Sequence, residues 1–328
     1  MESFLKYSET IQYFYEKGFN VFTYDHQSQG LSGRWLSESQ SLWVNSFDDY
    51  VDDFVYFVSL VNKDSPHIPV YVLAHSMGGM ITAMAMARLP TLINRAVLCA
   101  PMIRNKCGMK CFDYKYPPPQ PLVYWMTYVA CYAGLGSAHC MGYFKEKPTD
   151  KLSLHVTTSD QEQLNNWQDL RMRYPSLICT CVTNDWILHA IRAQKRFSHR
   201  YETVRTNTLV LSGETDYFVN NRAIVEFVKK APAAKLFTVP GTFHELLQEK
   251  EPTRDACRTV ILNFFTQKSD NVSTVEPCYP LESCDARNTP LFSYPELILR
   301  GTGLVLATVG VVAGCAMILG GRGGKGRY

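Results

Sequence analysis

Short apolar runs alternate with amphipathic segments over the first hundred residues. Residues 19–26 and 70–75 are runs of β-branched and aromatic residues, which predicts two buried strands. Residues 5–17 and 47–61 repeat apolar residues near helical spacing, and the second segment has an acidic outer face. Because strands and helices alternate in this way when helices cover both faces of a parallel sheet, we expect an α/β fold.

The same alternation continues on either side of a long central segment. Before it, the pattern predicts a buried helix over 78–89 and a buried strand over 95–101. After residue 205 it predicts strands at 206–216 and 234–241 and helices at 220–231 and 255–267. We therefore expect residues 1–267 to form one domain with a mostly parallel sheet.

The central segment, about 103–205, breaks this rhythm. It opens with the proline-rich loop "KYPPPQP", continues with the aromatic and apolar run 123–136, and includes a mixed helical segment at 164–176. An insert of this length in a compact domain is usually functional or disordered, and this one is too apolar to be disordered. We expect a lid or cap that packs over the edge of the sheet.

The C-terminal region changes character twice. Residues 268–296 are polar with several prolines, which predicts a linker, and 301–321 carry no charge over 21 residues. A run of that length predicts a transmembrane helix within 297–321, followed by a basic tail at 322–328. The alternative is a buried apolar helix of the soluble domain. We expect a single-pass membrane protein, whose basic tail favours a cytosolic C-terminus, although a tail-anchored protein facing the cytosol is equally consistent.

Composition excludes some classes of function. The net charge of +3 over 328 residues shows no basic footprint for nucleic acid. The eleven cysteines have no regular metal-ligand spacing, so we expect buried thiols and no metal site.

The segment "VYVLAHSMGGM", residues 70–80, predicts a strand, a sharp turn with Ser76 at its tip, and a helix. Small residues flank the serine, as a nucleophile on a strained turn requires, with Ala74 in place of the first glycine of G-x-S-x-G. The amide of Met77, at the start of the helix, is placed to stabilise an oxyanion. The pattern alone is moderately specific, and an ordinary turn serine remains the alternative.

A serine nucleophile needs a histidine base and a carboxylate that orients the base. Asp216 lies just beyond one predicted strand, and His244 lies in a loop before the last helix. The order serine, acid, histidine is the one used by a large class of hydrolases. Glu214 is a competing candidate for the acid. Asp25 is a weaker candidate, because it precedes the serine in the chain and so does not follow this order.

Three other titratable side chains are expected to have structural roles and not catalytic ones. We expect His75 to point away from the tip of the turn and to serve in packing. Asp185 and His189, four residues apart on a predicted helix, are expected to form a contact within the cap.

Five motifs together resemble the lysophospholipase and monoglyceride-lipase-like group of α/β hydrolases. They are "YDHQSQGLSGR", "SFDDYVDDF", "LAHSMGG", "SGETDYFVNNR" and "GTFHELLQEK", and the resemblance covers residues 1–267. It implies an α/β-hydrolase fold with Ser76 as nucleophile, Asp216 as acid and His244 as base. It also implies ester hydrolysis of a monoacyl lipid without metal or organic cofactor. The cap residues Tyr124, Trp125, Met126 and Tyr128 are then expected to shelter the acyl chain.

Two departures from the family pattern affect these expectations. Gln27 and Ser28 replace an Arg-Gly pair, which concerns support of the site more than its chemistry. In the family, the stretch resembling Glu2–Glu9 follows a strand and a loop that supplies a second oxyanion amide. We therefore expect an N-terminal truncation in which the first strands are missing. The alternatives are an aminopeptidase-type hydrolase on the same fold and a catalytically impaired membrane-tethered fragment.

Overall fold

The computed structural model describes residues 2–64, 67–106, 118–141, 143, 145–152 and 154–267, together with the backbone of 316–321. Within these residues the main sheet has six strands in the order β1-β8-β3-β4-β6-β7. The strands are β1 (Phe19–Thr23), β3 (Val70–His75), β4 (Arg95–Cys99), β6 (Asn207–Gly213), β7 (Ala234–Val239) and β8 (Ala316–Gly321). The run from β3 to β7 is parallel, as predicted.

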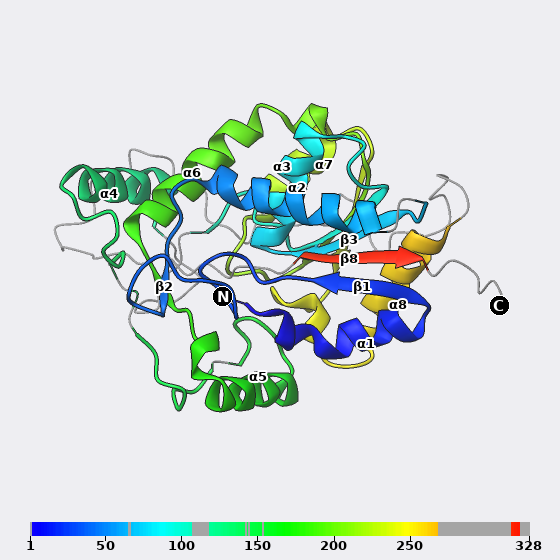
Figure 1. The fold of residues 1–328 in the computed structure, drawn as a ribbon, viewed down its shortest axis with the longest axis horizontal. Helices are drawn as coiled ribbons and strands as arrows, with labels where there is room; N and C mark the ends of the chain where they lie inside the picture. Colours follow the sequence, from blue (N-terminus) through cyan, green and yellow to red (C-terminus); the bar gives the residue numbers. More distant parts are fainter. Residues whose placement is uncertain are drawn as a thin grey trace.

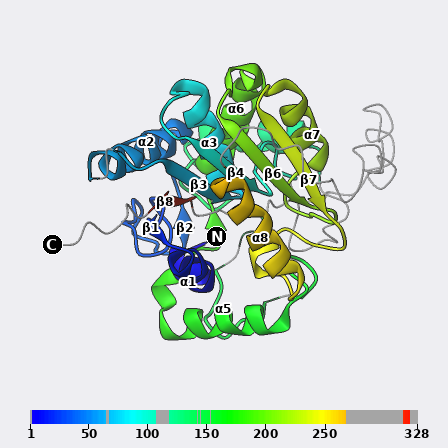
Figure 2. The same ribbon diagram turned by 90° about the vertical axis from the view of Figure 1, so that its right-hand side faces the viewer.

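Helices cover both faces of this sheet (Figures 1 and 2). One face carries α2 (Phe47–Asp64), α3 (Met77–Arg88) and α7 (Asn221–Lys230), and the other carries α1 (Ser8–Glu16) and α8 (Thr253–Thr266). Short 3₁₀ turns complete the path at η1 (Phe4–Tyr7), η2 (Pro175–Leu177), η3 (Tyr201–Thr203) and η4 (Leu246–Gln248). The predicted helix over 5–17 thus begins as a 3₁₀ turn, and the two faces hold two separate apolar clusters.

The central insert divides between two sides of the molecule. Its helices α4 (Gln120–Tyr132) and α6 (Asn184–Ser198) pack together on the side of α2, whereas α5 (Gln161–Arg173) lies beside η1 and α1 (Figures 1 and 2). The prediction of one lid over one edge is therefore wrong in this respect. Helix α6 buries most of an apolar face, whereas the polar α5 buries only Leu164, Trp167 and Arg171.

A small second sheet, not predicted, links the insert to the rest of the domain. Strand β2 (Ser41–Leu42) pairs in parallel with β5 (Cys181–Val182) just before α6 begins. The amide of Thr183 also donates to the carbonyl of Leu42 at 3.2 Å.

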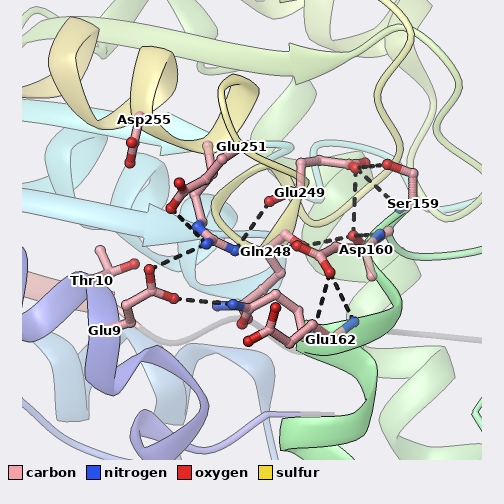
Figure 3. A network of polar contacts seen from close by, with 12 residues as sticks. Glu9, Thr10, Ser159, Asp160, Glu162, Gln248, Glu249, Glu251 and Asp255 are labelled. Carbon is pink, nitrogen blue, oxygen red and sulfur yellow. Dashed lines mark hydrogen bonds and ion pairs between the residues drawn. The ribbon is translucent and has the colours of Figure 1, made fainter.

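Charged side chains join α5 to the N- and C-terminal helices of the domain (Figure 3). Arg254 on α8 contacts Glu9 on α1 at 3.3 Å and Asp160, the N-cap of α5, at 3.4 Å. Arg258, one turn further along α8, contacts Glu9 at 3.0 Å. Both arginine side chains are buried, and a buried charge is stable only when it is paired. These ion pairs therefore hold together α1, the start of α5 and α8, which are distant in sequence.

The prediction of a transmembrane helix through 301–321 is wrong over its last six residues. Residues 316–321 form β8, which lies between β1 and β3 and runs antiparallel to both. An apolar run satisfies its backbone groups in a strand as well as in a helix when hydrogen-bonding partners lie on both sides, which explains the difference. Residues 268–315 and the tail 322–328 lie outside the described residues. Among the helices that the structure describes, none has the length and apolar character needed to cross a bilayer.

Candidate active site

Ser76 occupies a strained turn between β3 and α3. Its φ of 50° and ψ of −114° lie outside the usual regions for a residue with a side chain. The amide of Ser76 donates to the carbonyl of Cys99 at 2.9 Å, and its carbonyl accepts from the amide of Met102 at 2.8 Å. A Cβ on Gly79 would lie 2.8 Å from the Cβ of Pro101, so the helix after the turn needs a glycine there. The neighbouring strand β4 and the segment after it therefore hold the turn in place.

The structure brings Ser76, His244 and Asp216 into one hydrogen-bonded line. Nε2 of His244 lies 3.0 Å from Oγ of Ser76, and Nδ1 lies 2.6 Å from Oδ2 of Asp216. All three residues are buried, with exposed fractions of 1%, 0% and 2% for Ser76, His244 and Asp216. Because Nδ1 faces a carboxylate, which accepts hydrogen bonds, the proton of the neutral ring lies on Nδ1. Nε2 then accepts the hydroxyl hydrogen of Ser76.

Asp216 is held in its ionised form. Burial acts to raise the pKa of its carboxyl, but the positive charge that His244 carries when protonated and the hydrogen bond from its ring outweigh burial and lower it. The amides of Phe218 and Val219 add hydrogen bonds to Oδ1 at 2.7 Å and 2.9 Å. A carboxylate with this set of partners fixes both the position of the His244 ring and the location of its proton.

The competing carboxylates have other partners. Oε2 of Glu214 accepts from the amide of Gly241 at 2.8 Å. Asp25 accepts from the amides of Phe4 and Leu31, each at 2.8 Å. Both carboxylates order loops around the site, whereas the hydrogen bond from His244 goes to Asp216.

Asp185 also has a structural partner, since Oδ2 accepts from Nε1 of Trp43 at 2.9 Å. Burial lowers the pKa of His189, one turn further along α6.

Met77 is the first residue of α3, and its backbone amide belongs to the first turn of that helix. Amides in the first turn have no acceptor within the helix, and the helix dipole adds partial positive charge there. The position next to Ser76 is therefore suited to an anion.

His75, which was expected to point away from the tip of the turn and to serve in packing, also makes two buried polar contacts. Its Nε2 lies 3.1 Å from the carbonyl oxygen of His244, and its Nδ1 lies 3.0 Å from the hydroxyl of Tyr7. The sequence does not reveal this contact, because Tyr7 and His244 lie 68 and 169 residues from His75.

The aromatic residues of the cap are also placed differently from the expectation. Trp125 is 60% exposed and Tyr128 is 36% exposed, while the buried side chains of α4 are Val123 and Thr127. The structure thus gives no support to a shelter for an acyl chain built from Trp125 and Tyr128. Among the described residues, no group of three or more His, Cys, Asp or Glu is arranged to hold a metal ion.

Comparison with known proteins relates the whole domain to hydrolases. The family described as "Serine aminopeptidase, S33" matches residues 1–251. Lysophospholipase L2 of Escherichia coli K12 is 28% identical over 274 residues, which cover 81% of this chain and 78% of that protein. Monoglyceride lipase of Rattus norvegicus is 36% identical over 98 residues, which cover 30% of this chain and 31% of that protein.

Solved structures agree on the fold. Monoacylglycerol lipase of Paleococcus ferrophilus superposes with a TM-score of 0.59 at 14% identity and covers 80% of this chain and 90% of that one. A soluble variant of monoglyceride lipase from Saccharomyces cerevisiae gives a TM-score of 0.56 at 16% identity, covering 74% and 75%. Because the family match spans more than three quarters of the 328 residues, it identifies the domain as a whole. The chain belongs to the serine aminopeptidase S33 family and has an α/β-hydrolase fold.

Proposed function

We propose that the protein is a serine hydrolase that cleaves the carboxylic ester of a monoacyl lipid, either a lysophospholipid or a monoacylglycerol. The observation that carries this proposal is the hydrogen-bonded line from Ser76 through His244 to Asp216 at a strained turn. The names of the relatives, lysophospholipase and monoglyceride lipase, support the class of substrate.

In the proposed reaction, Ser76 is the nucleophile. His244 takes the hydroxyl proton while Oγ attacks the ester carbonyl, and the Met77 amide stabilises the oxyanion of the tetrahedral intermediate. Collapse of that intermediate breaks the bond to the alcohol, which leaves with the proton from His244 and leaves an acyl group on Ser76. A water molecule, deprotonated by His244, then attacks the acyl carbonyl. Collapse of the second tetrahedral intermediate breaks the bond to Ser76, and His244 returns the proton to Oγ as the fatty acid is released. Asp216 stabilises the charged form of His244 in both steps.

The experiment measures hydrolysis of four substrates by the protein of residues 1–328. These are a short p-nitrophenyl ester, a monoacylglycerol, a lysophospholipid and an aminoacyl anilide. We expect hydrolysis of the esters, and we expect Ser76→Ala to lower kcat by at least about 10³-fold. The matched control is Ser37→Ala, an exposed serine, which should leave the rate unchanged.

The outcomes separate the competing functions. Hydrolysis of the anilide without hydrolysis of the esters would assign the chain to the aminopeptidase class. Ester hydrolysis that survives Ser76→Ala would refute the role of this serine, and a folded protein inactive on all four substrates would refute the proposal.

A further inference from the structure

A buried chain of polar side chains reaches the main chain of His244. His75 contacts the carbonyl oxygen of His244 at 3.1 Å, and Tyr7 contacts the other ring nitrogen of His75 at 3.0 Å. The hydroxyl of Tyr7 donates to Oε2 of Glu2 at 2.7 Å. Each of these four residues is at most 4% exposed. The chain therefore connects the first residues of the domain to the loop that carries the proposed base.

The direction of each hydrogen bond follows from the chemistry of the groups. A carbonyl oxygen only accepts, so Nε2 of His75 must carry a proton. Burial and the neighbouring ring of His244 lower the pKa of His75 to about 3, so the ring is neutral near pH 7. With its single proton on Nε2, the ring presents Nδ1 to Tyr7 as an acceptor. The Tyr7 hydroxyl thus lies between two acceptors, Nδ1 of His75 and the carboxylate of Glu2, and its single hydrogen is donated to one of them at a time.

An ion pair holds Glu245, the residue that follows His244 in the same loop. Nζ of Lys6 lies 2.7 Å from Oε1 of Glu245 and 3.0 Å from Oε1 of Glu2. The side chains of all three residues are at most 6% exposed, so these charges depend on each other for compensation. Residues 2–7 therefore contact Glu245 directly through Lys6 and reach His244 through His75, and Glu2 takes part in both arrangements.

We propose that Glu2, Lys6, Tyr7 and His75 are positioning residues that fix the main chain of His244 and so align its ring between Asp216 and Ser76. This inference rests on the proposed function of Ser76 and His244. Side-chain contacts fix the two ring nitrogens of His244, but the ring keeps its place only when its backbone is also fixed. An error of about 1 Å in the position of a catalytic group costs about 10²-fold in rate.

An apolar side chain in place of His75 would fill space without a donor for the His244 carbonyl. The informative comparison is therefore His75→Phe with His75→Gln, because the glutamine amide retains an N–H for the carbonyl. We expect His75→Phe to lower kcat by about 10- to 100-fold with little change in KM, and His75→Gln to restore most of this loss. Tyr7→Phe should lower kcat in the same direction, whereas the matched variant Tyr13→Phe on α1 should not.

The pH profile distinguishes positioning from loss of folded protein. A weaker contact between His244 and Asp216 stabilises the protonated ring less, so the acid-side midpoint of kcat/KM should move to lower pH in His75→Phe. Loss of folded protein would scale the whole profile without moving it. Rates are therefore expressed per active site, counted with a fluorophosphonate that labels Ser76.

Proton NMR supplies a readout that does not depend on activity. The Nδ1 proton of His244, held at a short contact to Asp216, should give a low-field resonance in the wild type that broadens or shifts in His75→Phe and Tyr7→Phe. The inference would be overturned if folded His75→Phe and Tyr7→Phe kept the kcat of the wild type. It would also be overturned if the pH profile and the low-field resonance of both variants were unchanged. Absence of Ser76-dependent hydrolysis in the wild type would instead refute the proposed function, and the resonance would still test the positioning.

Discussion

Asp216 and Glu214 lie two residues apart after β6, and only their partners distinguish them. The ring of His244 donates to Asp216, while Glu214 accepts from the Gly241 amide. We expect Asp216→Asn to lower kcat by about 10³- to 10⁴-fold, because the amide no longer selects the required tautomer of His244. Glu214→Gln, the matched control, should stay within a few-fold of the wild type. Steady-state kinetics on one ester checks both variants, and the reverse ranking would assign the acid to Glu214.

Glu2 should contribute to stability in a defined range of pH. Burial acts to raise the pKa of Glu2, but the charge of Lys6 and the hydrogen bond from Tyr7 contribute to lowering it to about 2 from 4.5. A lowered pKa in the folded state gives stability that is complete above pH 4.5 and is lost as the pH falls toward 2. At about 1.36 kcal/mol per unit, the contribution is at most about 3 kcal/mol.

Denaturant unfolding of the wild type and Glu2→Gln at pH 6 and pH 3 tests this expectation. The variant should be less stable at pH 6, and the difference between the two proteins should shrink at pH 3. An equal difference at both values of pH would show that the ionisation of Glu2 does not stabilise the fold.

The end of β6 and the loop that carries His244 approach each other without space for a side chain. A Cβ on Gly213 would lie 2.0 Å from the carbonyl oxygen of Phe243 and 2.9 Å from its carbonyl carbon. The obstructing atoms belong to the backbone, so the loop itself must move. A carboxylate also holds that loop, since Oε1 of Glu249 accepts from the Phe243 amide at 2.8 Å while Oε2 accepts from the amide of Ser159 in the insert.

Gly213→Ala should therefore displace His244 from Ser76. We expect a lower Tm and a fall in kcat of at least about tenfold, consistent with the cost of misplacing a catalytic group. Gly33→Ala is the matched control, because a Cβ there meets nothing within 4 Å and its φ is ordinary. Calorimetry and kinetics on both variants check the expectation, which fails if Gly213→Ala retains the Tm and kcat of the wild type.

Prediction from sequence succeeded where local pattern and topology agree. The strands before Ser76 and Asp216 are strongly apolar, and parallel strands bring their carboxyl ends to one edge, so these residues were expected near each other. The partners of His75 were not predictable, because Tyr7 reaches it only through the packing of η1. The position of α5 was also not predictable, since its helical pattern does not specify which side of the sheet it contacts.

The connection of β1 to the rest of the sheet is made by β8, a strand that comes from residues 316–321. Each strand spacing is about 4.8 Å, so β1 and β3, which both pair with β8, lie roughly 10 Å apart. Periodicity did not identify β8, because an uninterrupted apolar run is compatible with either a helix or a buried strand. Without β8, the N–H and C=O groups of β1 and β3 that now pair with it would lose their partners, and unpaired backbone groups are costly when buried.

A protein ending at residue 315 should therefore be less stable than one ending at residue 321, which retains β8 and serves as the matched control. We expect its Tm to fall by roughly 5 °C or more. Amide hydrogen exchange should accelerate in 19–23 and 70–74, the segments paired with β8, and should change least in 234–239, at the opposite edge of the sheet. Because the loss begins beside β3, which leads into Ser76, ester hydrolysis should fall along with stability. Equal Tm values and equal exchange in the two proteins would show that the sheet does not need β8, and β1 would then have to be held by α1 and the loop that follows it.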